Sequence, residues 1–310
     1  SRPGDATQML MKIPVLHEGE DPAAIVSFEM EQMIMPRLKG PHVPRHIANG
    51  DFATQPYIVM ERLDGETLLP QLDALPLPAE TVAKLGAKIA DALAALHAQG
   101  VVHLDLKPSN IMFRQNGDAV LIDFGLAHHR DLPDLMQEEF RLPYGTAPYM
   151  APEQIQGEPV DARADLYALG CILYEAIVGV PPFGMIPVAD VAWGHLQRSP
   201  VAPCEIVDGV APDLEAIVLR LLAKPPARRF GYAVDVAAAL GRLLGETMPE
   251  DEPLGRPYLN RPSFAGRDEA LSTLRALVRR LDGNAGGVAI VCAESGAGKT
   301  RLAIECGREA

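Results

Sequence analysis

Hydrophobic residues near the start of the chain follow two different periods. From residue 7 to 15 apolar side chains alternate, which predicts a strand from which Lys12 projects. Residues 24–38 then carry apolar side chains three and four positions apart, with Glu31 on the same stripe, which predicts a helix that Pro36 ends or kinks. A pair of strands is expected at residues 47–52 and 57–60. The opening of the chain is therefore predicted to be small and strand-rich.

Helices are expected to dominate from residue 82 onward. The most regular stripe runs from residue 82 to 96 and is closed by Gly100, a typical residue just past a helix end. A hairpin follows, in which 111–113 and 119–122 flank Asn116-Gly117, a strong two-residue turn signal. Further helical stripes occupy 164–178, 212–223 and 233–244. A strand-rich segment before a larger helix-rich one predicts an α+β fold with two lobes, 1–62 and 63–245.

The pattern changes again after residue 245. Residues 246–262 have no periodicity and combine four prolines with acids, which is typical of a semi-extended linker. In the segment 263–310 the pattern predicts a different order of elements: an amphipathic helix, a buried strand at Val288–Val291 and a glycine-rich loop. The helix is predicted from Leu271, Leu274, Leu277 and Leu281. We therefore expect a second domain to begin at about residue 263.

Composition excludes several classes of protein. With 48% hydrophobic and 22% charged residues, the 310-residue chain can bury a core and is not a disordered polymer. A net charge of −13, with 28 basic residues dispersed among 41 acids, argues against a nucleic-acid surface. No apolar run approaches the roughly 20 residues of a membrane helix. The four cysteines are far apart in the sequence, so we expect a reducing cytoplasm.

The candidate chemistry centres on residues 103–110, which read His-Leu-Asp-Leu-Lys-Pro-Ser-Asn, and on Asp123-Phe124-Gly125 after the hairpin. These motifs resemble the catalytic loop and metal-binding triplet of protein kinases. The residues from Gly145 to Glu153, Gly-Thr-Ala-Pro-Tyr-Met-Ala-Pro-Glu, resemble the end of a kinase activation segment. The resemblance implies that Asp105 is the base, that Lys107 steadies the γ-phosphate of ATP, and that Asn110 and Asp123 hold Mg²⁺.

Other kinase-like features lie on both sides of this loop. Lys12 resembles the strand lysine that binds the α- and β-phosphates, with Glu31 as its ion-pair partner. Residues 57–63 resemble the hinge, where Met60 would line the adenine pocket and the backbone of Glu61 and Leu63 would meet the adenine edge.

Two further acids resemble structural acids of the family. Asp165 resembles the buried acid that ties down the catalytic loop, and Glu153 is expected to pair with Arg229. The adjacent Arg228 leaves this pairing open.

A second nucleotide motif lies near the end of the chain. Residues 293–300 read Ala-Glu-Ser-Gly-Ala-Gly-Lys-Thr after the predicted strand and before a helical pattern, and so resemble a phosphate-binding P-loop. Backbone amides around Gly296 and Gly298 would cradle phosphates, Lys299 would reach the terminal phosphates, and Thr300 would ligate magnesium. Ala293 replaces the first glycine of the motif. The segment resembles the start of the AAA-like (STAND) ATPase domains of bacterial signalling proteins.

The kinase resemblance has three departures. The glycine-rich loop that covers the phosphates is not found, since only Gly4 precedes Lys12, and its two strands are expected upstream of Ser1. Leu104 stands where many kinases carry an arginine that binds a phosphate on the activation segment. Residues 126–145 contain no Ser or Thr, in agreement with Leu104. Activation without phosphorylation of that segment is therefore expected.

Together these motifs indicate a bacterial Hanks-type, non-specific serine/threonine protein kinase joined to the start of a P-loop ATPase domain. The resemblance implies ATP and Mg²⁺ as cofactors and proteins with Ser or Thr as substrates, and leaves the oligomeric state open. A small-molecule phosphotransferase is the weaker alternative, because such enzymes lack the segment at 145–153. A pseudokinase that acts as a nucleotide-binding scaffold is another, although Lys12, Asp105, Asn110 and Asp123 are all intact.

Overall fold

The computed structural model divides the chain into two compact units, Ser1–Asn260 and Arg261–Ala310. It describes residues 8–14, 22–72, 75–136, 144–185, 187–245, 268–279 and 290–291, together with Leu302 and Cys306. None of the helices in these ranges combines the length and apolar character needed to cross a lipid bilayer.

The first lobe of unit 1 is a three-stranded antiparallel sheet with one helix. The strands are β1 (Met9–Lys12), β2 (His46–Asn49) and β3 (Ile58–Glu61), in the order β1-β3-β2. Helix α1 (Pro22–Ile34) ends where a short 3-10 turn, Met35–Arg37, begins. Pro36 lies in that turn, because it cannot donate the next helical hydrogen bond. The predicted early end of this helix is confirmed.

The second lobe is built on helices, with two small sheets at its border with the first. Strand β4 (Gly65–Thr67) joins the hairpin of β6 (Ile111–Arg114) and β7 (Ala119–Leu121), and β5 (Val101–Val102) pairs with β8 (His128–His129). The hairpin turns at Gly117, whose φ of 83° explains why glycine follows Asn116. The hairpin was predicted, whereas β4, β5 and β8 were not, because two or three residues carry no detectable period.

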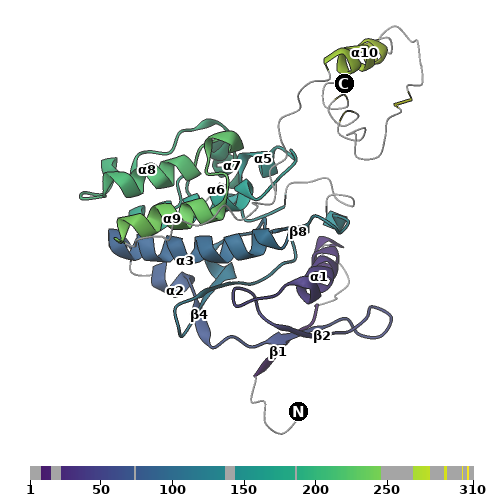
Figure 1. Cartoon of the computed structure of the whole chain (residues 1–310), viewed down its shortest axis with the longest axis horizontal. Helices are drawn as coiled ribbons and strands as arrows, with labels where there is room; N and C mark the ends of the chain where they lie inside the picture. The colour runs from purple at the N-terminus through teal and green to yellow at the C-terminus, as the bar shows by residue number, and fades with distance from the viewer. Residues whose placement is uncertain are drawn as a thin grey trace. The chain divides into compact units, whose positions relative to one another are not determined.

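Helix α6 (Arg163–Val178) is the centre of the second lobe and is buried almost all round. Helices α3 (Ala79–Ala98) and α8 (Pro212–Leu221) pack against it, and α9 (Ala233–Leu243) packs against both α3 and α8 (Figure 1). Gly86 of α3 allows this approach, since a Cβ atom there would lie 2.8 Å from Leu240 and 3.0 Å from Leu173. The lobe also contains α2 (Leu69–Leu72), α5 (Pro152–Ile155) and α7 (Val188–Gln197).

In unit 2 the structure describes α10 (Asp268–Arg279), which includes three of the four leucines of the predicted amphipathic helix. The buried strand expected at Val288–Val291 is wrong for the two residues of it that are described. Ile290 is 83% exposed and Val291 37% exposed, and neither lies in a strand. In the described part of this unit no neighbouring strand pairs with them, and a strand stays buried only between such neighbours.

Candidate active site

Lys12 and Glu31 join the sheet of the first lobe to α1. Lys12 ends β1, and Glu31 lies on the buried face of α1 with Phe28 and Ile34. The Nζ atom of Lys12 lies 2.6 Å from a carboxylate oxygen of Glu31. Burial lowers the pKa of Lys12, but the negative charges of Glu31 and Asp123 outweigh burial and raise it above its ordinary value. Lys12 therefore carries a positive charge at neutral pH.

Asp123 reaches the same ammonium group from the end of the β6–β7 hairpin. Its Oδ1 atom lies 3.0 Å from Lys12 Nζ. Its φ of 67° falls in the left-handed region, which is uncommon for a residue other than glycine. Burial raises the pKa of Asp123, but the charge of Lys12 and its hydrogen bond outweigh burial and hold the pKa below its ordinary value. Asp123 is thus an ionised carboxylate.

Asp165, a buried acid in the first turn of α6, fixes the loop that leads to Asp105. One carboxylate oxygen accepts the backbone N–H of His103 at 2.8 Å and bonds to His97 Nε2 at 2.8 Å, and the other accepts the N–H of Leu104 at 2.9 Å. Burial raises the pKa of Asp165, but the hydrogen bond from His97 outweighs it and lowers the pKa. The central helix thus holds the backbone immediately before Asp105.

Asp105 lies at the centre of a polar cluster. One carboxylate oxygen accepts the hydroxyl of Thr146 at 2.7 Å and its backbone N–H at 3.0 Å. The other accepts Lys107 Nζ at 2.7 Å, and this ammonium group also lies 3.0 Å from the Thr146 hydroxyl. Asn110 Nδ2 donates to the backbone carbonyl of Asp105 at 2.9 Å and to its carboxylate at 3.2 Å. The loop therefore presents a carboxylate, an ammonium group and an amide within one hydrogen-bonded cluster.

The strand end at Met60 and Glu61 leads from the first lobe to the second. Met60 is buried in β3, whereas Leu63 is partly exposed. The backbone N–H of Glu61 donates to the Arg45 carbonyl at 2.8 Å, and its carboxylate accepts Arg114 at 2.7 and 3.2 Å. Both groups of Glu61 are thus engaged within the fold.

Residues 7–238 match the model of the protein kinase domain family and include Lys12, Glu31, Asp105, Asn110 and Asp123. The chain belongs to the protein kinase family.

Several bacterial serine/threonine-protein kinases are similar to this kinase. It is 37% identical to the serine/threonine-protein kinase PknB of Mycobacterium leprae over 238 residues, which are 74% of this chain and 38% of that protein. It is 39% identical to PknB of Mycolicibacterium smegmatis over 232 residues, which are 72% of this chain and 36% of that protein. Over 200 residues, 62% of this chain and 31% of the relative, it is 40% identical to a probable PknB of Corynebacterium glutamicum. The kinase thus spans less than two-fifths of the length of these relatives.

The donor set of this kinase fits the magnesium that members of the family use with ATP. Asn110 turns its Nδ2 towards Asp105, so its Oδ1 is the remaining end, with the Ser109 hydroxyl 3.4 Å away. An amide oxygen and an ionised carboxylate, Asp123, are hard oxygen ligands. Magnesium is usually held by one or two such protein ligands together with substrate phosphates.

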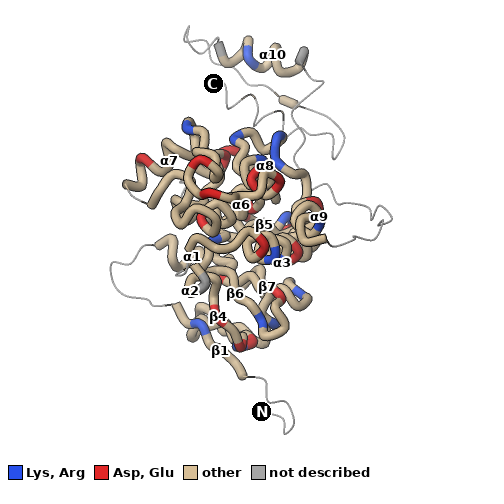
Figure 2. Tube along the Cα trace, turned by 90° about the vertical axis from the view of Figure 1, so that its left-hand side faces the viewer, with Lys and Arg blue, Asp and Glu red and all other residues tan. Residues whose placement is uncertain are grey.

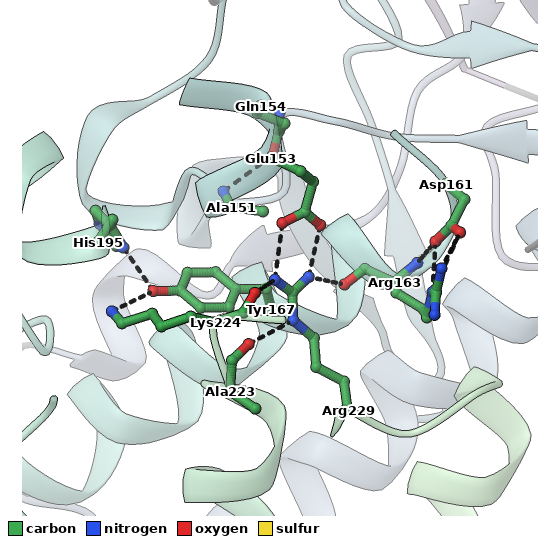
Figure 3. A network of polar contacts seen from close by, with 10 residues as sticks. All are labelled: Ala151, Glu153, Gln154, Asp161, Arg163, Tyr167, His195, Ala223, Lys224 and Arg229. Carbon is green, nitrogen blue, oxygen red and sulfur yellow. Dashed lines mark hydrogen bonds and ion pairs between the residues drawn. The ribbon is translucent and has the colours of Figure 1, made fainter. Parts of the chain in front are cut away.

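In the second lobe Arg229 pairs with Glu153, as Figure 3 shows. The two bonds measure 2.6 and 2.7 Å, and the Arg229 side chain is fully buried. Arg228 is exposed, so the pairing that the sequence left open is decided in favour of Arg229. Near this pair the hydroxyl of Tyr167 bonds to His195 at 2.9 Å (Figure 3).

Two residues that help to hold the catalytic loop, one of them through Asp165, were not predicted. His97 bonds to Asp165, and Gln154 Nε2 donates to the Leu104 carbonyl at 2.8 Å. His97 could have been noticed, because it is a polar residue beside Leu96 at the end of an otherwise apolar stripe. For Gln154 the sequence offers no such signal, since its partner lies fifty residues earlier.

The four predicted P-loop residues, Gly296, Gly298, Lys299 and Thr300, lie outside the described residues, as does the linker 246–262. In the described part of the kinase domain, acidic and basic residues occur together on the same helices, for example α3 and α8 (Figure 2).

Proposed function

We propose that this kinase domain transfers the γ-phosphate of Mg-ATP to serine and threonine hydroxyls of proteins. The observation that carries the proposal is the position of Lys12, whose ammonium group bonds at once to Glu31 and to Asp123. These partners lie 19 and 111 residues away in the sequence, yet they meet at one charge. The names of the relatives, serine/threonine-protein kinases, support the same reaction.

Each charged residue would have a separate task. Lys12, oriented by Glu31, would bind the α- and β-phosphates, and Asp123 and Asn110 would hold the metal. Bound magnesium neutralises the charge that develops between the β- and γ-phosphates. Lys107 would bind the γ-phosphate beside Asp105.

Asp105 would orient the substrate hydroxyl and finally accept its proton. Its carboxylate already accepts the hydroxyl of Thr146 at 2.7 Å, so it faces a position from which a hydroxyl can donate. Lys107 and Asn110 bond to the other carboxylate oxygen and keep the group fixed. A base held in this way needs little rearrangement during the reaction.

Adenine would bind at the hinge. Met60 would line its pocket, and the edge of the base would meet the backbone of Glu61 and Leu63. Because the N–H of Glu61 donates to Arg45, we infer that Glu61 would offer its carbonyl to adenine.

Activation of this kinase would not need a phosphate on the activation segment. Leu104 occupies the position of a phosphate-binding arginine, and its side chain packs against the hydrophobic core. An apolar group there cannot meet a new negative charge, and a phosphorylation switch needs a cation. The absence of Ser and Thr from 126–145 supports the same conclusion.

The segment 263–310 would begin an AAA-like P-loop ATPase domain that couples a nucleotide-dependent state to the kinase in bacterial signalling. The support for this part of the proposal is the sequence motif at 293–300. In it Gly296, Gly298 and Lys299 would bind phosphates, and Thr300 would ligate magnesium.

The kinase proposal is tested by phosphate transfer from labelled ATP to a general protein substrate such as casein. Asp105→Asn and Asp123→Asn should each lower the rate at least about a hundredfold, because they remove the base and a metal ligand. Asp208→Asn, at an exposed turn, is the matched control and should leave the rate unchanged. Phosphoamino-acid analysis should find phosphoserine and phosphothreonine. Transfer by both active-site variants at the rate of the control would contradict the proposal.

A further inference from the structure

The residue before Asp105 has an unusual backbone that is held at both ends. Leu104 has a φ of 62°, a left-handed conformation that a side chain with a Cβ atom adopts at a cost. Its N–H is bound by Asp165 of α6 at 2.9 Å, and its carbonyl by Gln154 of α5 at 2.8 Å. That carbonyl belongs to the peptide bond that joins Leu104 to Asp105. The orientation of Asp105 therefore depends on contacts from two different helices.

Gln154 is itself fixed by the helix on which it lies. It is the third residue of α5, it is 9% exposed, and its Oε1 accepts the N–H of Ala151 at 3.1 Å (Figure 3). A glutamine that reaches back in this way satisfies a free N–H at the helix start. Because its oxygen is used by Ala151, its NH₂ group points to Leu104.

The same carbonyl lies next to the segment that precedes α5. A Cβ atom at Gly145 would lie 3.5 Å from the Leu104 carbonyl oxygen, so that segment passes close to the catalytic loop. Thr146, the next residue, donates twice to the Asp105 carboxylate. The backbone and the side chain at 104–105 thus both receive contacts from residues 145–154.

We infer that Gln154 is a positioning residue for phosphoryl transfer, which holds the Leu104–Asp105 peptide so that the Asp105 carboxylate faces the substrate hydroxyl. The inference rests on the proposed function, because it assigns Gln154 to the reaction of Asp105. If the inference holds, Asp105 is correctly oriented only when α5 is packed against the catalytic loop. Gln154 touches neither nucleotide-binding group, Lys12 nor Asp123, so its loss acts on turnover and leaves ATP affinity unchanged.

The first test is Gln154→Met, which keeps the length of the side chain and removes both hydrogen bonds. In the full chain with its natural flanking sequence, kcat should fall about tenfold or more, because a buried carbonyl loses its donor. The KM for ATP should stay within about twofold of the wild-type value. Gln156→Met, an exposed position two residues later, is the matched control and should match the wild type. Rates are counted per nucleotide-binding site, so that unfolded protein does not lower them.

A second variant separates positioning of the peptide from simple capping of α5. Leu104→Asn places at this position a residue that enters the left-handed region more readily. If Gln154 holds the Leu104 peptide, it is needed less when residue 104 adopts the left-handed conformation more readily. Gln154→Met should then lower kcat by only about threefold or less in the Leu104→Asn background. Equal losses of kcat in both backgrounds would overturn the inference, as would an unchanged kcat in Gln154→Met.

Failure of the proposed function would appear separately, as a wild-type chain that transfers no phosphate and does not differ from Asp105→Asn. That result would also overturn the positioning role of Gln154. Hydrogen exchange of residues 103–106 tests the contact itself without activity. Exchange should be about tenfold faster in Gln154→Met than in Gln156→Met, and equal exchange in the two variants would overturn the contact as a restraint.

Discussion

Replacing Arg229 with methionine would test how the second lobe is held together. The guanidinium group donates five hydrogen bonds, two to Glu153 and three to the backbone carbonyls of Ala223, Arg163 and Lys224. Five is the full number of N–H groups that arginine offers. The side chain is fully buried, and that of Glu153 is 5% exposed. Methionine fills similar space but donates to none of these partners.

The expected loss of stability is large because Glu153 would remain buried without a counter-charge. Removing one partner of a buried ion pair typically costs about 3–5 kcal/mol. The three carbonyls lose their donors as well, which places the effect at the upper end of that range, about 5 kcal/mol. For a domain of this size, such a change lowers the melting temperature by about 10–20 °C.

Thermal unfolding followed by circular dichroism measures this difference. Arg228→Met is a close control, since it makes the same substitution one residue earlier on an exposed side chain, and it should change the melting temperature little. Adding Glu153→Leu to Arg229→Met should restore part of the stability, because the unpaired charge is then gone. Equal melting temperatures for the two arginine variants would refute the reasoning.

Three further predictions concern binding, pH and activation. Lys12→Met should weaken ATP binding, measured by calorimetry, at least about tenfold. Lys39→Met, at an exposed position, is the control and should not weaken it. Equal ATP affinities of the two variants would contradict the assignment of Lys12. Burial, with the nearby charge of Lys224, lowers the pKa of His195 from 6.5 to about 4, so the unfolded chain takes up a proton in this range that the folded chain does not. The free energy of unfolding should therefore fall as the pH drops from 6.5 to about 4, and it should fall less in His195→Gln. If the urea midpoints of the two proteins change equally with pH, the prediction for His195 is wrong. Finally, phosphatase treatment that leaves residues 126–150 free of phosphate should not change the kinase rate, and a loss traced to that segment would show the inference from Leu104 to be wrong.

Local signals in the sequence were sufficient for the elements that carry the catalytic motifs. The stripe at 82–96 became α3, and the turn at Asn116-Gly117 became the β6–β7 hairpin. The pairing of Lys12 with Glu31 was implied only by the resemblance to protein kinases, and their atoms lie 2.6 Å apart. The stripe and the turn could be predicted because periodicity and turn chemistry depend on neighbours a few residues away. The same reasoning did not reveal α7, whose buried residues are Val191, Gly194 and His195 and form no apolar stripe.

Contacts between distant segments were decided only by the tertiary structure. Arg228 and Arg229 are chemically equivalent in the sequence, and the direction of the chain after the 3-10 turn at 226–228 determines which one reaches Glu153. In the sequence Gln154 has no feature that distinguishes it from other helix residues, and only the fold brings its amide to the Leu104 carbonyl. In the same way, an apolar run such as Val288–Val291 predicts a buried strand, but burial requires neighbours that sequence pattern alone does not supply. The sequence therefore determined which groups this kinase carries and in which local elements, whereas long-range packing around α6 determined which of them meet, because a hydrogen bond between residues fifty positions apart depends on every element folded between them.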